Sequence, residues 1–474
     1  MIASMGKIRE KFFGSKEFYL AVLAIALPIA IQNCFTNFVN LLDNVMVGQM
    51  GTLEMSGVSI SNQILFVCNL CIFGTVSGGG IFCSQFFGAD DYEGVRSSIR
   101  FKLIVGLTII TIAILCFVFA GDKLIYLFLS GEKDLDSVNK TLNFGFSYLK
   151  IMAIGIPGFL LSQVYASTLR EGGETMLPMK AGVTAIITNL VLNYLLIFGH
   201  LGFPKLGVNG AAIATVIGQF ITAVLSLIYI CKMKNLSIGL KDLIIDANEC
   251  ITTLKSGLTS FLSQISLVLA MMAINNMIMK YSVIDPIFSS PELTQIPMAV
   301  LGIVMKFFQI VISIVVGLSA GCIPIVGFNI GSGYKKRVRD LLKLLLISEF
   351  VVGLVSFILV EFFPDQLISL FGASSESIYY TLYAEKAFRI YLALIILACI
   401  NKATFIFLQG MGKVLESTIL SMVREVVFGV GFALLLPVFF KLDGVLYSMP
   451  ISDLITFIIS VYLLIKISKE LKKG

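Results

Sequence analysis

The sequence has little charge, a single histidine and no tryptophan. Only 14% of its 474 residues are charged, whereas soluble domains carry roughly a quarter. So little charge excludes a soluble enzyme, a nucleic-acid-binding protein and a secreted disulfide scaffold. One histidine also leaves no ligand set for a zinc site. The chain is instead 57% hydrophobic with a mean hydropathy of +0.95, which places it in a lipid bilayer.

Neither the cysteines nor the N-terminus indicates secretion. The nine cysteines are scattered through apolar runs, and we interpret them as core packing. Residues 1–17 are basic and lack a cleavable signal, which indicates a short cytoplasmic segment at the membrane surface.

Twelve stretches are apolar enough to cross a bilayer, for which about 20 residues are needed. They lie at residues 18–45, 54–80, 97–120, 140–168, 175–199, 208–231, 251–280, 292–320, 338–363, 378–408, 414–440 and 444–466. Several are longer than a span requires, so we expect tilted or kinked helices.

Lysine and arginine are unevenly divided between the two ends of these spans. If the N-terminus is cytoplasmic, 24 of them fall on the cytoplasmic side and 8 on the outer side, while three lysines lie within spans. Basic residues are retained in the cytoplasm. We therefore expect a multi-pass protein of the plasma membrane with both termini cytoplasmic.

The two halves of the chain repeat each other at an offset of 243 residues. The recurring pairs include Gly74 and Gly317, Gly78 and Gly321, Gly88 and Gly331, Val95 and Val338, Arg96 and Arg339, and Tyr148-Leu149 and Tyr391-Leu392. Each half holds six spans, an even number, so the repeats are parallel, as in transporters that open a central site to each side in turn. The Gly74-x3-Gly78 spacing also predicts closely packed helices.

This repeat predicts an all-α polytopic membrane protein of two pseudo-symmetric six-helix bundles. The expected parts are a cytoplasmic N-terminal segment (1–17), an N-lobe (18–231), a cytoplasmic inter-lobe linker (232–250), a C-lobe (251–466) and a cytoplasmic tail (467–474).

The chain lacks a nucleotide-binding loop. No GxxxxGK[ST] motif occurs, because Gly412-Lys413 is followed by Val414 and has no suitable upstream glycine. Transport must therefore be driven by an ion gradient, with H+ or Na+ as the coupling ion and no other cofactor. One histidine and no nucleophile–base pair also argue against an enzyme.

Asp43 in the first span is the main candidate for ion coupling. Acids inside a membrane are costly to bury and mark ion pathways, since burial favours binding of a proton or a cation. Pro28 lies fifteen residues earlier, lacks the N–H of the helix ladder and predicts a kink. Two simpler interpretations remain open: Asp43 is hydrated at the outer interface, and Pro28 is a purely structural kink.

Two asparagines in the fifth span share one helix face. Asn189 and Asn193 are four residues apart, and Thr215 in the sixth span would add a hydroxyl. Facing Asp43, these side chains would orient its carboxylate or supply oxygens to Na+. Interhelical hydrogen bonding without a role in coupling is the alternative.

The second half carries different polar residues within its spans. The candidates for a substrate cavity are Gln264, Asn275, Lys306 and Asn401, and Lys402 follows the last of them. Three roles are open for Lys306 and Lys402: binding an anionic group, repelling cations, or extending to an interface as long charged side chains do. Charged residues close to the predicted span ends are expected at interfaces or in pairs, namely Glu349, Glu361, Arg424, Glu425 and Asp453.

Several short motifs occur in order along the whole chain. They are Leu42-Asp43-Asn44-x2-Val47-Gly48, Asn189-x3-Asn193, Gly207-Val208-Asn209-Gly210, Gly321-x2-Pro324-Ile325-x-Gly327-Phe328-Asn329-x-Gly331 and Pro450-Ile451-Ser452-Asp453. Together they resemble the multidrug and toxic compound extrusion (MATE) exporters, and most closely the MepA-like branch.

The resemblance implies a V-shaped exporter with two six-helix lobes, which expels organic and often cationic compounds in exchange for H+ or Na+. It also implies an N-lobe acid, a bending proline and a polar cluster, which match Asp43, Pro28, and Asn189, Asn193 and Thr215. Some branches have an aspartate at the position of Asn193, and others a glutamate where this chain has Gln264. Coupling is therefore expected in the N-lobe, with Asp43 as its one carboxylate.

Two functions follow from these observations. The first is an ion-coupled antiporter for amphipathic cations, a monomer in the lipid bilayer that binds small organic molecules and no nucleic acid. In it, cation binding to Asp43 alters the first helix near Pro28 and weakens substrate binding. The alternative is a lipid-linked oligosaccharide flippase of the same superfamily, in which Lys306 and Lys402 hold an anionic pyrophosphate headgroup.

Overall fold

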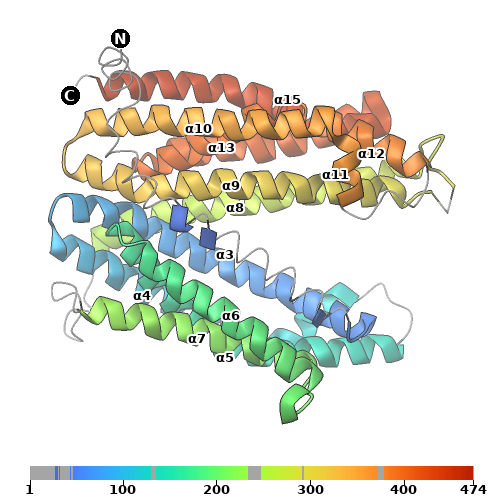
Figure 1. Ribbon diagram of the computed structural model, residues 1–474, viewed down its shortest axis with the longest axis horizontal. Coiled ribbons are helices and arrows are strands. Elements are labelled where there is room, and N and C mark those ends of the chain that lie inside the picture. The colour runs from blue at the N-terminus through green and yellow to red at the C-terminus, as the bar shows by residue number, and fades with distance from the viewer. Residues whose placement is uncertain are drawn as a thin grey trace. The chain divides into compact units, whose positions relative to one another are not determined.

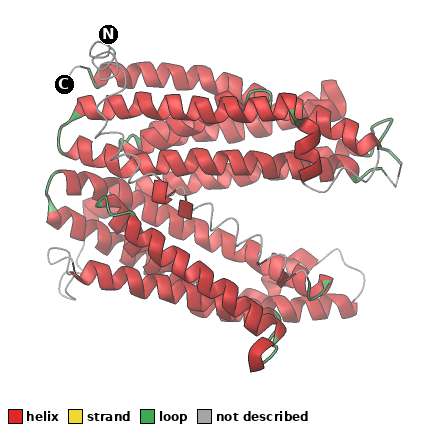
Figure 2. Cartoon of the chain, in the orientation of Figure 1, coloured by secondary structure: helices red, strands yellow, loops and turns green. Residues whose placement is uncertain are grey.

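Helices joined by short turns make up the computed structural model (Figure 1). The structure describes residues 27–29, 31–32, 43, 46–47, 49–129, 135–232, 247–290, 293–370 and 378–472, and no strand is found in these ranges (Figure 2). The expected all-α class is confirmed. The expected N-terminal segment (1–17) and most of the first span (18–45) lie outside the described residues.

The chain divides into two compact units, and the first contains Leu27–Phe261. Its described helices are α3 (Thr52–Gly88), α4 (Tyr92–Leu129), α5 (Leu135–Glu171), α6 (Met176–Phe198), α7 (Val208–Lys232) and the first part of α8 (Ala247–Ser282), with a 3-10 turn at His200–Gly202. An apolar core joins α3, α4, α5 and α7. Helix α6 packs mainly on α7.

The second unit contains Leu262–Gly474. Its helices are the rest of α8, α9 (Ile296–Gly331), α10 (Lys335–Phe362), α11 (Pro364–Leu370), α12 (Ile378–Tyr391), α13 (Ile395–Gly410), α14 (Val414–Met422) and α15 (Gly431–Glu470), with a π-helical segment (Val423–Val430) before α15. The boundary between the two units falls within α8, between Phe261 and Leu262. The expected linker (232–250) lies mostly outside the described residues. The expected lobe boundaries therefore stay predictions.

The described chain accounts for eleven of the twelve expected spans. Nine segments of the described chain are long and apolar enough to cross a bilayer, and α12 with α13 make a further span that is bent by 47°. One of the nine, Val414–Glu470, has 57 residues, or about 85 Å at a rise of 1.5 Å per residue, which is twice the length that a membrane needs. Its backbone breaks at Lys441, with φ 53° and ψ −132°, so it forms two spans.

The segment Val414–Glu470 folds back on itself at this break. The Lys413 ammonium pairs with the Glu470 carboxylate, although 57 residues separate them. Beyond the break, a Cβ on Gly444 would lie 2.5 Å from the Leu436 carbonyl carbon, so only glycine allows this approach. The eleventh and twelfth spans are therefore an antiparallel pair.

Apolar side chains cover the outer surfaces of the helices. Helix α4 contains the most hydrophobic window of the described chain, yet only 17% of that window is buried. Its outward side chains include Leu107, Ile112 and Phe119. Apolar surface of this extent would drive aggregation in water and is instead matched by lipid.

Helices α3 and α8 cross at glycines within the first unit. A Cβ on Gly78 would lie 2.5 Å from the Gly257 nitrogen, and a Cβ on Gly74 would lie 2.9 Å from the Gly257 carbonyl oxygen. Small residues at such crossings let two backbones approach closely in a membrane. The Gly74-x3-Gly78 spacing therefore has the packing role expected of it.

Replacing Gly78 with alanine is expected to lower stability, because the added methyl group meets backbone atoms that cannot move aside. Gly302 on α9 is a matched control, since a Cβ there would meet nothing within 4 Å. Thermal unfolding of the purified protein in detergent should show a lower midpoint for Gly78→Ala and no loss for Gly302→Ala. Equal midpoints for the two variants would contradict the close crossing.

Candidate functional site

The Asp43 carboxylate lies against α6 inside the first unit. Asn193 Nδ2 donates a hydrogen bond to Asp43 Oδ1 at 2.6 Å. Asn193 is 1% exposed and Asn189 is 7% exposed, whereas Asp43 is half-buried. Asp43 therefore points at the buried amides of the fifth span, as the sequence predicts, and its role in ion coupling stays a prediction.

Two described residues of the first span, Gln32 and Asp43, meet α6 in the order in which α6 runs. A Cβ on Gly182 would lie 2.8 Å from Gln32 Nε2, and eleven residues further along both segments Asp43 meets Asn193. Eleven residues are close to three turns of an α-helix, so Gly182 and Asn193 occupy one face of α6. The periodicity of α6 thus aligns its polar face with the first span.

A chain of hydrogen bonds continues from Asp43 to α7. Asn193 Nδ2 also donates to Asn189 Oδ1 at 3.3 Å, and Asn189 Nδ2 donates to Thr215 Oγ1 at 3.2 Å. The Thr215 hydroxyl in turn donates to the Ala211 carbonyl at 3.0 Å. The structure therefore brings together all four residues of the predicted coupling site.

The Asn189 amide satisfies its neighbours better with its oxygen and nitrogen exchanged. In that orientation its nitrogen donates to Asp43 Oδ1 at 3.2 Å and its oxygen accepts from Thr215 at 3.2 Å. Both amides of α6 then donate to the Asp43 carboxylate.

The oxygen atoms around Asp43 suit the binding of a proton or a hard cation. Within the described residues no group of three or more His, Cys, Asp and Glu side chains is arranged to hold a metal ion. The site offers one carboxylate, two amides and a hydroxyl, and the buried Asn193 Oδ1 has no hydrogen-bond partner. Oxygen ligands of this kind match Na+, while the carboxylate alone suffices for H+.

Two residues near Asp43 were missed by sequence reasoning. The Tyr148 hydroxyl on α5 is hydrogen-bonded to the Asn62 side chain on α3 and lies within electrostatic range of Asp43. Tyr148 is 6% exposed. The one signal in the sequence that marked Tyr148 was the repeat, which pairs it with Tyr391. The repeat carried no information about which residues lie next to Tyr148.

The remaining predicted residues do not gather in one place. Pro28 is buried in a helical turn, but the residues after it lie largely outside the described ranges, so its kink stays a prediction. Of the candidates for a substrate cavity, Asn401 lines a cavity in the second unit, whereas Gln264, Asn275 and Lys306 do not. Asn275 and Lys306 are exposed, on α8 and α9 respectively.

Replacing Asn193 with leucine is expected to change the affinity for the coupling ion. Hydrogen bonds to charged groups contribute about 1.5–3 kcal/mol, so the ion concentration at half-maximal export should change about tenfold or more. With Na+ as the coupling ion it should rise, because an oxygen ligand is lost. With H+ it should fall, because the amide that stabilises the ionised form is lost.

The measurement is the initial rate of fluorescent-cation transport in proteoliposomes against the concentration of each ion. Thr188→Ala on the same helix is the control, since the Thr188 hydroxyl donates to the Thr184 carbonyl and takes no part in the site. If Asn193→Leu gave the same half-maximal concentration as this control, Asn193 would have no role in ion binding.

One known protein resembles the chain over nearly its whole length, and another resembles it over less than half. The multidrug export protein MepA of Staphylococcus saprophyticus subsp. saprophyticus is 24% identical, over 94% of this chain and 93% of its own. The probable multidrug resistance protein NorM of Thermotoga maritima is 30% identical over 43% of this chain and 42% of its own.

Solved structures show the same fold. A MATE crystal structure in the bent conformation matches with a TM-score of 0.82 at 22% identity, covering 97% of this chain and 99% of that chain. A MOP superfamily transporter from Pyrococcus furiosus also matches with a TM-score of 0.82, over 96% of both chains. The family model described as MatE matches residues 28–195 and 260–435. The resemblance inferred from the motifs is therefore confirmed, and the chain belongs to the MatE family, the multidrug and toxic compound extrusion proteins.

Proposed function

We propose that this protein is a secondary antiporter that exports organic, amphipathic cationic compounds in exchange for H+ or Na+. The names of its relatives, which are multidrug export and resistance proteins, support the substrate class. The observation that carries the proposal is the Asp43 carboxylate held against the buried Asn193 and Asn189 amides. The protein is then a transporter of the plasma membrane and not an enzyme, and we infer cytoplasmic termini and a monomer.

Charge balance at Asp43 explains how ion and substrate alternate. An ionised carboxylate in a half-buried site is unfavourable unless a cation or a proton compensates it. Uptake of the coupling ion from outside compensates the charge that the α6 amides meet at Asp43, and so changes the contacts between the first span, α6 and α7. Substrate affinity falls in the ion-bound state, so the substrate leaves as the ion enters.

The coupling ion is identified by imposing one gradient at a time. The purified protein is reconstituted into liposomes, and the liposomes are loaded with a fluorescent cation. Export of this cation is followed under a pH gradient alone and under a Na+ gradient alone. We expect one of the two gradients to drive export against the substrate gradient. Export that neither gradient accelerates would contradict the proposal.

The flippase alternative requires Lys306 and Lys402 to bind one headgroup. Lys306 is exposed on α9, whereas Lys402 on α13 lines a cavity together with Arg424 and Glu425. Their different surroundings give no support to a shared anion site, and we therefore do not propose this function.

A further inference from the structure

The start of α10 carries positive charge that the proposed mechanism does not use. Residues 334–343 include five basic residues and one acid. Three of the basic residues, Lys336, Arg339 and Lys343, are spaced by three and four positions and therefore share one face of the helix. We refer to these three residues as the basic face of α10. The expected span begins at residue 338, so the basic face lies where α10 meets the membrane surface.

The repeat provides a matched segment in the first unit, at the start of α4. Helix α4 begins at Tyr92 and α10 begins at Lys335, which are 243 residues apart. Val95 and Val338, which occupy matching positions, are both buried. The structure therefore keeps the register of the repeat, and each residue of the basic face has a counterpart on α4.

On α4 a carboxylate of the chain itself neutralises the positive charge. Arg96 Nη2 donates to Glu93 Oε2 at 2.9 Å, and Arg100 Nη2 donates to Glu93 Oε1 at 2.6 Å. These residues have the same spacing as the basic face of α10. One carboxylate thus serves two guanidinium groups.

On α10 the corresponding carboxylate is missing. Lys336 takes the position of Glu93, while Arg339 and Lys343 take the positions of the two arginines. Arg339 is half-buried, its Nε has no hydrogen-bond partner, and its guanidinium pairs with no acid among the described residues. The one acid of the segment, Asp340, lies 4.0 Å from the Lys343 ammonium. The basic face therefore lacks the anion that its counterpart on α4 has.

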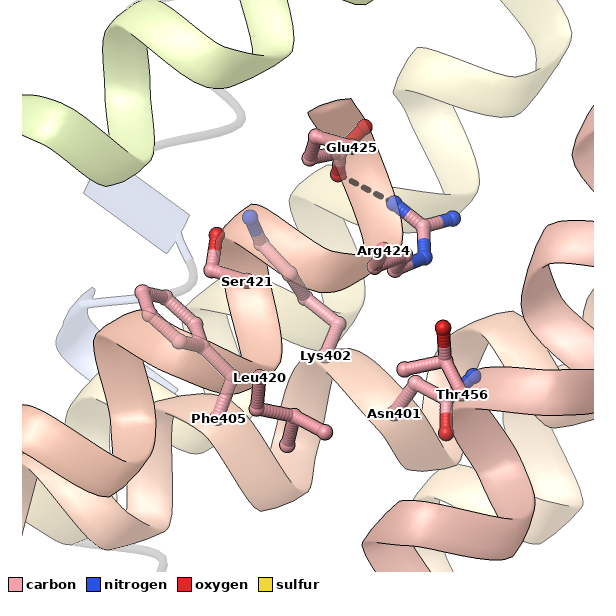
Figure 3. Close-up of a pocket in the computed structure, with 8 residues that line it drawn as sticks. All are labelled: Asn401, Lys402, Phe405, Leu420, Ser421, Arg424, Glu425 and Thr456. Carbon is pink, nitrogen blue, oxygen red and sulfur yellow. Dashed lines mark hydrogen bonds and ion pairs between the residues drawn. The ribbon is translucent and has the colours of Figure 1, made fainter. Parts of the chain in front are cut away.

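A second group of charges in the second unit is balanced internally. Arg424 Nε donates to Asp453 Oδ1 at 2.6 Å, and Arg424 also pairs with Glu425 (Figure 3). These three residues are at most 6% exposed, so they are paired, as the sequence suggests, but deep in the helix bundle. With Lys402, which lines the same cavity, the group has two cations and two carboxylates. It needs no anion from outside, in contrast to the basic face of α10.

An apolar stripe continues the basic face along α10. Ile347, Phe350 and Leu354 follow Lys343 at four, seven and eleven positions, spacings that keep them on one helix face. All three side chains are at least 37% exposed. A phospholipid with net negative charge matches this order, because its phosphate lies at the membrane surface and its acyl chains lie below.

We propose that the basic face of α10 binds the phosphate headgroup of an anionic phospholipid. The phosphate takes the place that the Glu93 carboxylate has on α4, and the acyl chains cover the apolar stripe. Basic residues next to a span attract anionic lipids in this way. They also set the orientation of a membrane protein, but that role does not require a half-buried arginine without an acidic partner. The proposal does not depend on the antiport.

The test is native mass spectrometry of the full-length protein, freed of lipid in a neutral detergent and titrated with one lipid at a time. The probes are phosphatidylglycerol, which is anionic, and phosphatidylcholine with the same acyl chains. We expect the wild type to bind phosphatidylglycerol more tightly. Arg339→Gln should weaken this binding about fivefold, the contribution of one basic residue near an anionic lipid surface. Lys336→Glu supplies the carboxylate of the repeat and should weaken it further.

Arg96→Gln is the matched control, since Arg96 already has Glu93 as its partner, and it should bind both lipids as the wild type does. Glycerol phosphate, which has no acyl chains, should not displace the lipid at equal concentration. If one α10 variant does not fold, the other decides the question.

Four results would overturn the proposal: no preference for phosphatidylglycerol in the wild type, an unchanged preference in the α10 variants, an equal loss in Arg96→Gln, or displacement by glycerol phosphate. An equal loss in the control would show that only the total charge matters. Displacement would show a site for soluble anions. Because no transport is measured, each result is independent of whether Asp43 couples export to an ion.

Discussion

Replacing Asp43 with asparagine is expected to abolish gradient-driven export. The substitution keeps the size of the side chain and removes the charge that a proton or Na+ compensates. Among the described residues, Asp43 is the carboxylate that meets the amides of α6, so no neighbouring acid takes over its role. Transport of a fluorescent cation in proteoliposomes should fall to the level of protein-free liposomes under the gradient that drives the wild type.

Asp136→Asn is the matched control for this experiment. Asp136 lies in the same unit, on α5, but its side chain is exposed and pairs with Lys140 one helical turn away. Such surface pairs contribute little, so export should be retained. Full gradient-driven export by Asp43→Asn would show that another group couples the ion.

Removing one partner of the Lys102–Glu171 pair is expected to cause the largest loss of stability. Lys102 Nζ lies 2.5 Å from Glu171 Oε2 between α4 and α5, and their side chains are 0% and 8% exposed. Ser167 also accepts from Lys102, at 3.2 Å. Glu171→Gln leaves the ammonium buried without a counter-charge, which costs about 3–5 kcal/mol in such pairs.

A double-mutant cycle measures the pairing itself. Thermal unfolding midpoints in detergent are compared for Lys102→Met, Glu171→Gln and the two combined. Because the double variant buries no unpaired charge, it should be more stable than either single variant. Additive losses would mean that the two groups do not interact. The exposed Asp136–Lys140 pair should show almost no effect in the same cycle.

The fold could be predicted from the sequence because each signal in it is long. About 20 apolar residues per span and the repeat at 243 residues average over many side chains, so local errors do not accumulate. The helices extend beyond the predicted spans, as with α4, which runs from Tyr92 to Leu129 where 97–120 was expected. Hydropathy marks the part within the lipid and does not report where a helix ends in water.

The candidate site was only partly predictable. Asn189 and Asn193 were recognisable because a helix of known period places them on one face. Lys102 lies near the start of the expected span 97–120 and was not singled out, yet it is fully buried. Glycines on α3 make room for it, since a Cβ on Gly79 would lie 2.8 Å from Lys102 Cγ. Contacts between distant spans of this kind leave no trace in local composition.

The central claim is that the coupling ion acts on substrate binding through Asp43. The most direct test is the Kd of a fluorescent cation for the purified protein, measured at increasing H+ and at increasing Na+. One of the two ions should weaken binding to the wild type by roughly 5- to 150-fold, the usual range of such coupling. In Asp43→Asn most of this dependence should be lost. An equal ion dependence in the wild type and in Asp43→Asn would contradict the account.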